Sequence, residues 1–142
     1  MTNQCFIVQQ RWFAEVWNQG RTEVIDELLS PDVTAHGLVD PNGNPVHGAE
    51  QFKLYHQSFR SAFPDIRVTV EDTVCEGNKI VVRCRVQATH TGAGFGFTPT
   101  HKPVDFAGMC MLRIDEGKIV EAWNSFDFLA MFGQLGMLSM PG

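Results

Sequence analysis

The sequence predicts an α+β fold, in which helices from the first half of the chain pack against one face of a mostly antiparallel sheet built by the second half. Apolar residues recur at helical spacing in the first half. From residue 66 the apolar pattern changes to the period of two that is typical of β-strands. The 142 residues contain no repeat or linker and are 44% hydrophobic, which predicts a single domain over residues 1–142.

Three helices are expected in the first half. The first contains Phe6, Phe13, Val16 and Trp17 on one face and ends at Asn18-Gln19-Gly20, because glycine is a poor helix former. A second helix is expected over 22–29, closed by Ser30-Pro31-Asp32, with a short strand over 33–38 and a turn-rich loop over 40–45. The third covers 48–63, and its apolar stripe comprises Phe52, Tyr55, Phe59 and Phe63.

Alternating apolar residues predict the strands of the second half. The expected strands cover 66–71, 79–90, 104–114 and a final run that follows a hairpin turn at Asp115-Glu116-Gly117. A glycine-rich loop at 91–100 separates two of them and contains Phe95 and Phe97, which we expect to form a lid or an oligomer contact. Asp127 precedes a short apolar helix over 128–135 and is expected to cap its N-terminus.

The final strand contains three polar side chains that alternation assigns to two faces. Glu121 and Asp127 share one face with Trp123 and Ser125, where a surface or interface role is expected. Asn124 shares the opposite face with Val120, Ala122 and Phe126. An amide on an apolar face predicts a pocket, or at least a buried polar group that needs a partner.

Composition excludes several classes of function. The net charge of −5 with scattered cations argues against nucleic-acid binding. No run approaches ~18 apolar residues, so no membrane helix is expected, and the N-terminus lacks a signal-peptide pattern, which favours a cytoplasmic protein. The four cysteines form no C-x-x-C pair and no zinc spacing, so we expect reduced, mostly buried thiols and no metal site.

An ordered set of short motifs spans nearly the whole chain. In chain order they are Trp17-Asn18-Gln19-Gly20-Arg21, Ser30-Pro31-Asp32, His47-Gly48, Ala62-Phe63-Pro64-Asp65, Thr89-His90-Thr91-Gly92, Pro99-Thr100, Gly117-Lys118-Ile119-Val120-Glu121-Ala122-Trp123, Asp127 and Gln134-Leu135-Gly136. Together they resemble the SnoaL-like polyketide cyclases, also called ester cyclases, of the NTF2-like superfamily. Each motif alone is weak, and their order and spacing indicate the family but no particular substrate.

The resemblance implies an NTF2-like cone, a curved sheet wrapped around N-terminal helices, with an apolar pocket for a small hydrophobic ligand. It also implies a homodimer or higher homo-oligomer built on the outer sheet face. In the family's antibiotic cyclases the reaction is an aldol ring closure without metal or cofactor, in which an aspartate on the last strand is the general acid/base. By register that aspartate falls at Asn124 here, and two family histidines fall at Ala122 and Cys110.

The candidate site therefore combines the family position with nearby groups. An amide cannot accept and return a proton at neutral pH, so we expect His36 or His90 to replace the missing base while Asn124 polarises a carbonyl. The competing interpretations are a satisfied amide at Asn124 and a surface or loop-anchoring histidine at His90. The expected ligand contacts are Cys110, Phe106, Phe126, Trp17, Tyr55 and Phe59.

Three hypotheses follow from the sequence. The first is a cyclase-type enzyme that closes or isomerises a small hydrophobic carbonyl compound. The second is a binding or carrier protein that has the same cone without turnover, because the family's catalytic positions are changed. The third is a structural domain whose pocket is filled by its own aromatic and methionine side chains. Several hundred Å³ of empty cavity, the usual scale of ligand sites, would count against the third.

Overall fold

Six strands form one curved sheet in the order β2-β1-β6-β5-β4-β3, and neighbouring strands are antiparallel except for the parallel pair of β1 and β6. The structure is a computed structural model that describes residues 4–39 and 43–138. The elements are α1 (Gln4–Arg11), η1 (Trp12–Asn18), α2 (Thr22–Leu28), β1 (Leu29–Val39), β2 (Pro45–His47), α3 (Ala49–Ala62), β3 (Arg67–Glu76), β4 (Lys79–Thr89), η2 (Gly94–Gly96), β5 (Pro103–Asp115), β6 (Lys118–Phe126) and α4 (Phe128–Gln134).

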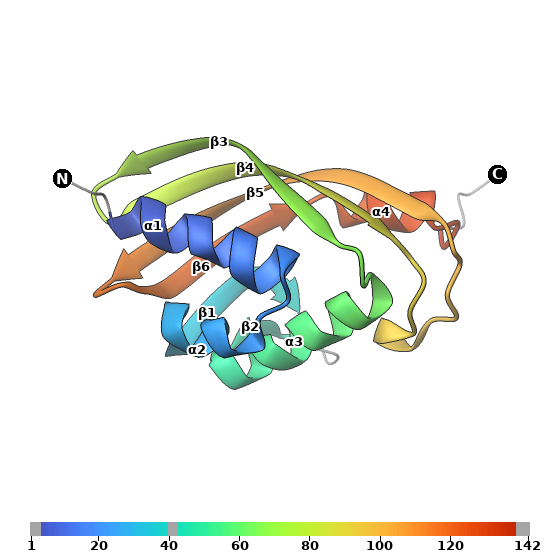
Figure 1. Ribbon diagram of the computed structural model, residues 1–142, viewed down its shortest axis with the longest axis horizontal. Coiled ribbons are helices and arrows are strands. Elements are labelled where there is room, and N and C mark those ends of the chain that lie inside the picture. The colour runs from blue at the N-terminus through green and yellow to red at the C-terminus, as the bar shows by residue number, and fades with distance from the viewer. Residues whose placement is uncertain (1–3, 40–42, 139–142) are drawn as a thin grey trace.

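The helices from the first half of the chain lie on the concave side of the sheet, as Figure 1 shows. α4 lies at the opposite end of the sheet from the start of α1, beside β5 (Figure 1). Apolar side chains from both layers meet between them and form one core cluster. The arrangement confirms the predicted α+β fold with its helices on one sheet face.

Two expectations about strand length are wrong. β1 begins at Leu29, before Ser30-Pro31-Asp32, and not after it. The strand accommodates Pro31 because its pairing with β6 is irregular between Leu29 and Thr34, so no regular ladder bond is lost there. β3 also extends to Glu76, well beyond the expected end at residue 71. Part of the expected loop over 40–45 lies outside the described residues, and Pro45 belongs to β2.

The helix after α1 has wider turns than an α-helix. In η1 the backbone N–H of Gln19 donates to the carbonyl of Ala14 at 3.1 Å, which is a five-residue separation. The wider turn changes which side chains face the sheet. Trp12, Phe13 and Trp17 all reach the space between the helices and the sheet.

The last hairpin contains a bulge that changes the predicted alternation. Arg113 pairs with Glu121 and Ile114 pairs with Ile119, so Val120 is an extra residue on β6. Ile119 therefore faces the core, and the expectation that Val120 shares the face of Asn124 is wrong. The turn itself uses Glu116 and Gly117 at positive φ, the pattern of a two-residue hairpin turn.

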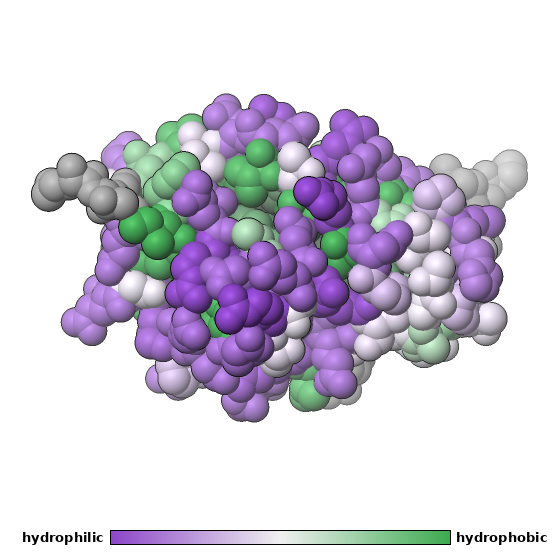
Figure 2. All heavy atoms as spheres, viewed as in Figure 1, coloured by the Kyte–Doolittle hydropathy of each residue, from purple (hydrophilic) through white to green (hydrophobic). Residues whose placement is uncertain are grey.

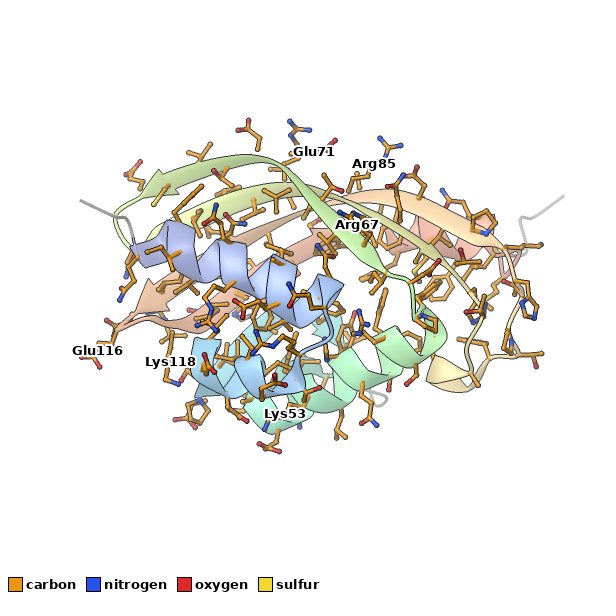
Figure 3. All side chains as sticks on the ribbon, in the orientation of Figure 1. Lys53, Arg67, Glu71, Arg85, Glu116 and Lys118 are labelled. Atoms are coloured by element: carbon orange, nitrogen blue, oxygen red, sulfur yellow. The ribbon has the colours of Figure 1, made fainter. Side chains whose placement is uncertain are left out.

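The outer surface is mostly polar. Figure 2 shows the helix-bearing side as largely hydrophilic with small, separate hydrophobic areas. On the sheet, Arg83 pairs with Glu71 at 3.1 Å and Arg85 with Asp105 at 2.6 Å, and Figure 3 shows Glu71 and Arg85 pointing away from the helices. Within 4–39 and 43–138, no helix has the length and apolar character needed to cross a membrane.

Candidate functional site

The concave face of the sheet and the helices enclose an apolar cavity of about 60 Å³. Half of its lining side chains are aromatic, and they come from η1, α3, β5, β6 and α4. They are Trp12, Phe13, Trp17, Phe52, Tyr55, Phe59, Phe106, Phe126 and Phe128. Asn124 and Tyr55 are lining residues with polar side-chain groups in this otherwise hydrophobic wall. The cavity is much smaller than the ~300–1,000 Å³ of most ligand sites, so an occupant requires side chains to move.

Helical spacing explains why α3 contributes a continuous aromatic wall. Phe52, Tyr55 and Phe59 follow one another at intervals of three and four residues, so all three project from one face. Their rings contact one another, with centroids 6.3 Å apart for Phe52 and Tyr55 and 6.0 Å apart for Tyr55 and Phe59. Trp17 packs edge-on against Phe59 at 5.8 Å and joins this wall to η1.

Phe128 closes the cavity at the α4 end. Its ring lies 6.4 Å from Phe59, 6.1 Å from Phe106 and 6.1 Å from Phe126. Phe128 and Phe126 are only half-buried, whereas Phe59 and Phe106 are fully buried, so the wall is partly exposed at this end. The sequence placed Phe128 in the last helix without assigning it to the pocket, although its position directly after the helix cap points its ring toward the sheet.

Two hydrogen-bonded contacts hold α4 in this position. Asp127 accepts a hydrogen bond from the backbone N–H of Ala130 at 3.0 Å, which confirms the predicted N-cap. At the other end of α4, the Gln134 side chain accepts from the N–H of Asp105 at 2.7 Å and donates to its carbonyl at 2.8 Å. The helix that carries Phe128 is thus joined to β5 at its far end.

Asn124 lies on β6 and reaches across to β1. Its Nδ2 donates to the backbone carbonyl of His36 at 3.0 Å. The two backbones approach closely beside this bond, because a Cβ at Gly37 would meet the Asn124 carbonyl oxygen at 1.9 Å. The partner is a carbonyl, which only accepts, so the amide NH₂ faces β1 and the side-chain oxygen faces away from it. Asn124 is therefore both a sheet-stabilising amide and a cavity-lining group.

His36 lies on the outer face of the sheet and not at the cavity. Val33 and Ala35 of β1 point into the core, so alternation directs His36 outward. Its Nε2 lies 2.7 Å from a Glu121 oxygen, and its ring stacks on Trp123 at 5.5 Å. The hydrogen bond from His36, followed by that from Arg113, lowers the pKa of Glu121. The expectation that His36 faces the cavity is wrong, because the buried residues Val33 and Ala35 take the inward positions of this strand.

His90 is buried and anchors the loop over 91–100. Thr100 donates its backbone N–H to Nδ1 of His90 at 3.1 Å, so that nitrogen is unprotonated. Burial lowers the pKa of His90, which agrees with a neutral ring. His90 is not among the residues that line the cavity. Of the two interpretations of His90, its contacts match the loop-anchoring histidine and not a base at the cavity.

The other expected residues divide into two groups. Trp17, Tyr55, Phe59, Phe106 and Phe126 line the cavity, while Cys110 is buried in the core cluster and does not. Their roles in binding stay predictions. Burial raises the pKa of the Cys110 thiol, which keeps it protonated and unreactive.

One histidine on α3 lies behind the cavity wall. His56 is buried, and its Nε2 lies 2.7 Å from the Val16 carbonyl oxygen. Burial is the largest cause of its lowered pKa. It therefore joins α3 to η1 as a neutral group behind the cavity wall.

The titratable groups of the site are few. Among the described residues, the cavity wall contains no carboxylate, histidine, lysine or arginine. Burial raises the pKa of Tyr55, which therefore stays neutral at physiological pH. Within the described part of the chain, no group of three metal-ligating side chains is close enough together to hold an ion. The wall can hold an apolar skeleton and hydrogen-bond it at neutral polar groups.

The curved sheet that wraps around helices and encloses an aromatic interior defines an NTF2-like cone. The SnoaL-like polyketide cyclase model matches residues 7–135. The chain therefore belongs to the SnoaL-like polyketide cyclase family, as the sequence motifs predicted. No curated protein matches the chain.

Solved structures of the same fold span almost the whole chain. One is a protein from Jannaschia sp. CCS1 proposed to be a SnoaL-like polyketide cyclase, with 24% identity, a TM-score of 0.83, and coverage of 96% of this chain and 94% of that one. IdmH from Streptomyces antibioticus, proposed to be a polyketide cyclase, has 31% identity, a TM-score of 0.81, and coverage of 94% and 99%. AclR from Streptomyces galilaeus, proposed to be a hydroxylase, has 28% identity, a TM-score of 0.80, and coverage of 97% and 85%.

Proposed function

We propose that the cone binds a small, mostly hydrophobic carbonyl compound of polyketide type and holds it as a carrier or binding protein. The observation that supports this most directly is the cavity wall, which is aromatic and aliphatic apart from neutral polar groups. Such a wall favours an apolar or aromatic skeleton over a charged metabolite, because an unpaired charge would be desolvated there. Family membership supports a polyketide-like compound as the occupant.

The same wall argues against acid/base turnover by this chain's own residues. An aldol closure requires a base near the carbon that loses its proton. The resemblance places the family's aspartate at Asn124, and neither His36 nor His90 lines the cavity. Among the described lining side chains, no group has a pKa suited to moving that proton.

A cyclase activity is the second candidate, and family membership favours it. Here the compound would enter as its enol, and the cone would fold it so that the reacting carbons meet, which is an effect of positioning alone. As the C–C bond forms, the enol O–H would pass its proton to the carbonyl oxygen under attack, so no base of the protein is required. The second N–H of the Asn124 amide, beside the one that is bonded to His36, would donate to that oxygen as charge develops on it. Ring closure that depends on Asn124 in a purified-protein assay would support this candidate over the carrier.

Replacing Phe128 with alanine is expected to enlarge the cavity and strengthen binding of a neutral hydrophobic probe, N-phenyl-1-naphthylamine. The wild type must displace Phe128 to admit the probe, and the variant need not, so we expect about fivefold tighter binding, or ~1 kcal/mol. The free energy of unfolding should fall by about 2–3 kcal/mol, less than for a fully buried phenylalanine. Probe fluorescence and urea titration measure these two effects.

The matched control for this variant is Leu129→Ala on the same helix, since Leu129 is 70% exposed and does not line the cavity. The control should bind the probe as the wild type does. Failure of both the wild type and the Phe128→Ala protein to bind the probe saturably would contradict a ligand-binding cone and favour the structural-domain hypothesis.

We also propose that the protein self-associates through the outer face of the sheet. Met109 is 47% exposed there, and Met111 lies opposite half-buried Trp123 on the neighbouring strand. Salt bridges flank this apolar area, including the pairs of Arg85 with Asp105 and Arg113 with Glu121. An apolar centre with a charged rim is typical of protein–protein interfaces.

Met109→Lys is expected to shift the protein from dimer to monomer, because a charge at the centre of an interface is desolvated without a partner. Light scattering after size-exclusion chromatography measures the mass of each species. Leu54→Lys is the control, since Leu54 is 66% exposed on α3, on the opposite side of the molecule from the sheet's outer face. A wild type that is monomeric at all accessible concentrations would contradict self-association.

A further inference from the structure

The Tyr55 hydroxyl is a polar group whose hydrogen-bonding capacity is not used within the described part of the chain. Its ring lines the cavity, and no described residue donates to or accepts from its oxygen. Among the described residues, the Gln9 side-chain oxygen is the one buried polar atom that has no partner and no access to solvent. The Tyr55 oxygen does not belong to that class, because it remains accessible. Tyrosine hydroxyls in largely apolar surroundings usually have a partner. A bound molecule is the partner that this arrangement leaves room for.

The protonation state decides which role the hydroxyl plays. Burial raises the pKa of Tyr55, so the phenol keeps its proton throughout the physiological range. A neutral phenol in an apolar wall is a strong donor to an oxygen acceptor and a poor base. The same apolar wall makes a carboxylate an unfavourable acceptor, because no described lining residue is cationic.

The ring is held in place from three directions. Phe52 and Phe59 flank it on α3, and Phe95 of η2 packs edge-on against it with centroids 6.4 Å apart. Phe95 also contacts Phe59 edge-on at 5.4 Å. Phe95 adopts a φ of +62°, a backbone conformation that residues other than glycine rarely adopt. The loop over 91–100 therefore holds Phe95 where it supports Tyr55.

We infer that Tyr55 is the residue that selects the functional group of the ligand, by donating a hydrogen bond to the oxygen of a neutral ketone or ester. This inference rests on the proposed function, since it requires a ligand in the cone. It adds a specificity-determining residue on α3 to the Asn124 position on β6. Discrimination by Tyr55 should depend on the carbonyl oxygen and not on the size of the compound.

Two probes of the same shape test this inference: acetophenone, which has a C=O group, and α-methylstyrene, which has C=CH₂ in its place. Titration calorimetry on the full-length wild type, Tyr55→Phe and Leu54→Ala gives the affinity for each probe. For each protein we compare one ratio, the affinity for acetophenone divided by the affinity for α-methylstyrene. We expect this ratio to be about five- to tenfold higher in the wild type and in Leu54→Ala than in Tyr55→Phe, which is the usual effect of one hydrogen bond. Tyr55→Phe removes one oxygen and leaves the ring packing intact.

Each outcome has a distinct meaning. Equal affinity ratios in the wild type and Tyr55→Phe would overturn the role of Tyr55 while leaving the ligand-binding cone standing. If neither the wild type nor Phe128→Ala binds either probe, the proposed function is overturned, and the Tyr55 role with it. A loss of affinity for both probes in Tyr55→Phe, with the ratio unchanged, would assign Tyr55 a packing role only and would also overturn the inference.

Discussion

Replacing Asn124 with aspartate is expected to place at the cavity a carboxyl group whose pKa lies well above the usual ~3.9. In the wild type the amide NH₂ donates to the His36 carbonyl at 3.0 Å. An ionised carboxylate at residue 124 would place its negative oxygen beside the His36 carbonyl oxygen, and the two acceptors would repel each other. A protonated carboxyl group can instead donate a hydrogen bond to that carbonyl, as the amide does. The apolar wall disfavours the charge as well, so both effects raise the pKa, by about 2–3 units.

This shift predicts an unusual dependence of stability on pH. Below about pH 3 the carboxyl is protonated in both the folded and the unfolded chain, so the variant should be nearly as stable as the wild type. As the pH rises, the unfolded chain ionises first, and the free energy of unfolding falls until the pH passes the folded pKa near 6–7. The total loss should be about 3–4 kcal/mol, since each pKa unit corresponds to ~1.4 kcal/mol.

Urea titrations of the wild type and Asn124→Asp from pH 4 to pH 8 measure this loss, and carbon NMR of the new carboxyl gives its pKa directly. Ser125→Asp is the matched control, because Ser125 is the next residue and is exposed. Its stability should follow the wild type over the whole range. A stability of Asn124→Asp that is independent of pH would contradict the contact between residue 124 and β1.

Replacing Gly92 with alanine is expected to lower the free energy of unfolding by at least about 3 kcal/mol, through a clash of main-chain atoms. A Cβ at Gly92 would lie 1.6 Å from the carbonyl oxygen of Ser61 and 2.8 Å from its carbon. The backbone N–H of Gly92 also donates to the Ala62 carbonyl at 3.1 Å. The end of α3 cannot move away easily, because Phe63 is buried beside it.

The same change should alter the site through the loop. If Gly92→Ala separates the loop over 91–100 from α3, Phe95 loses its ring contacts with Tyr55 and Phe59. Gly96→Ala in the same loop is the control: its Cβ would meet nothing within 4 Å, but its φ of +74° makes alanine strained. The control should lose only about 1–2 kcal/mol. Thermal and urea unfolding measure both, and equal losses would show that the loop is not docked on α3.

Local patterns in the sequence were sufficient for much of the fold. Spacing along residues 48–63 predicted the aromatic wall of α3, because helical periodicity needs no knowledge of the rest of the chain. Alternation placed Ala122, Asn124 and Phe126 on one face of β6. The capping role of Asp127 followed from its position before an apolar helix.

Other features depend on contacts between distant segments and could not be read locally. The bulge at Val120 arises in the pairing of β5 with β6, so alternation counted along one strand missed it. His36 was assigned to the wrong face, and its partners Glu121 and Trp123 lie far along the chain on β6. His90 is buried by a loop that returns to it through Thr100. Phe128 lines the cavity because Gln134 attaches α4 to β5, far from the ring itself.

The attachment of α4 to β5 also has a kinetic consequence. In the proposed binding function, we expect a compound to pass Phe128, whose ring packs against three aromatic residues of the wall. A movement of α4 that carries Phe128 away would break the two hydrogen bonds between Gln134 and the Asp105 backbone, at 2.7 and 2.8 Å. We therefore expect Gln134, which does not line the cavity, to slow the exchange of an occupant without changing its contacts. Affinity and exchange rate would then change independently.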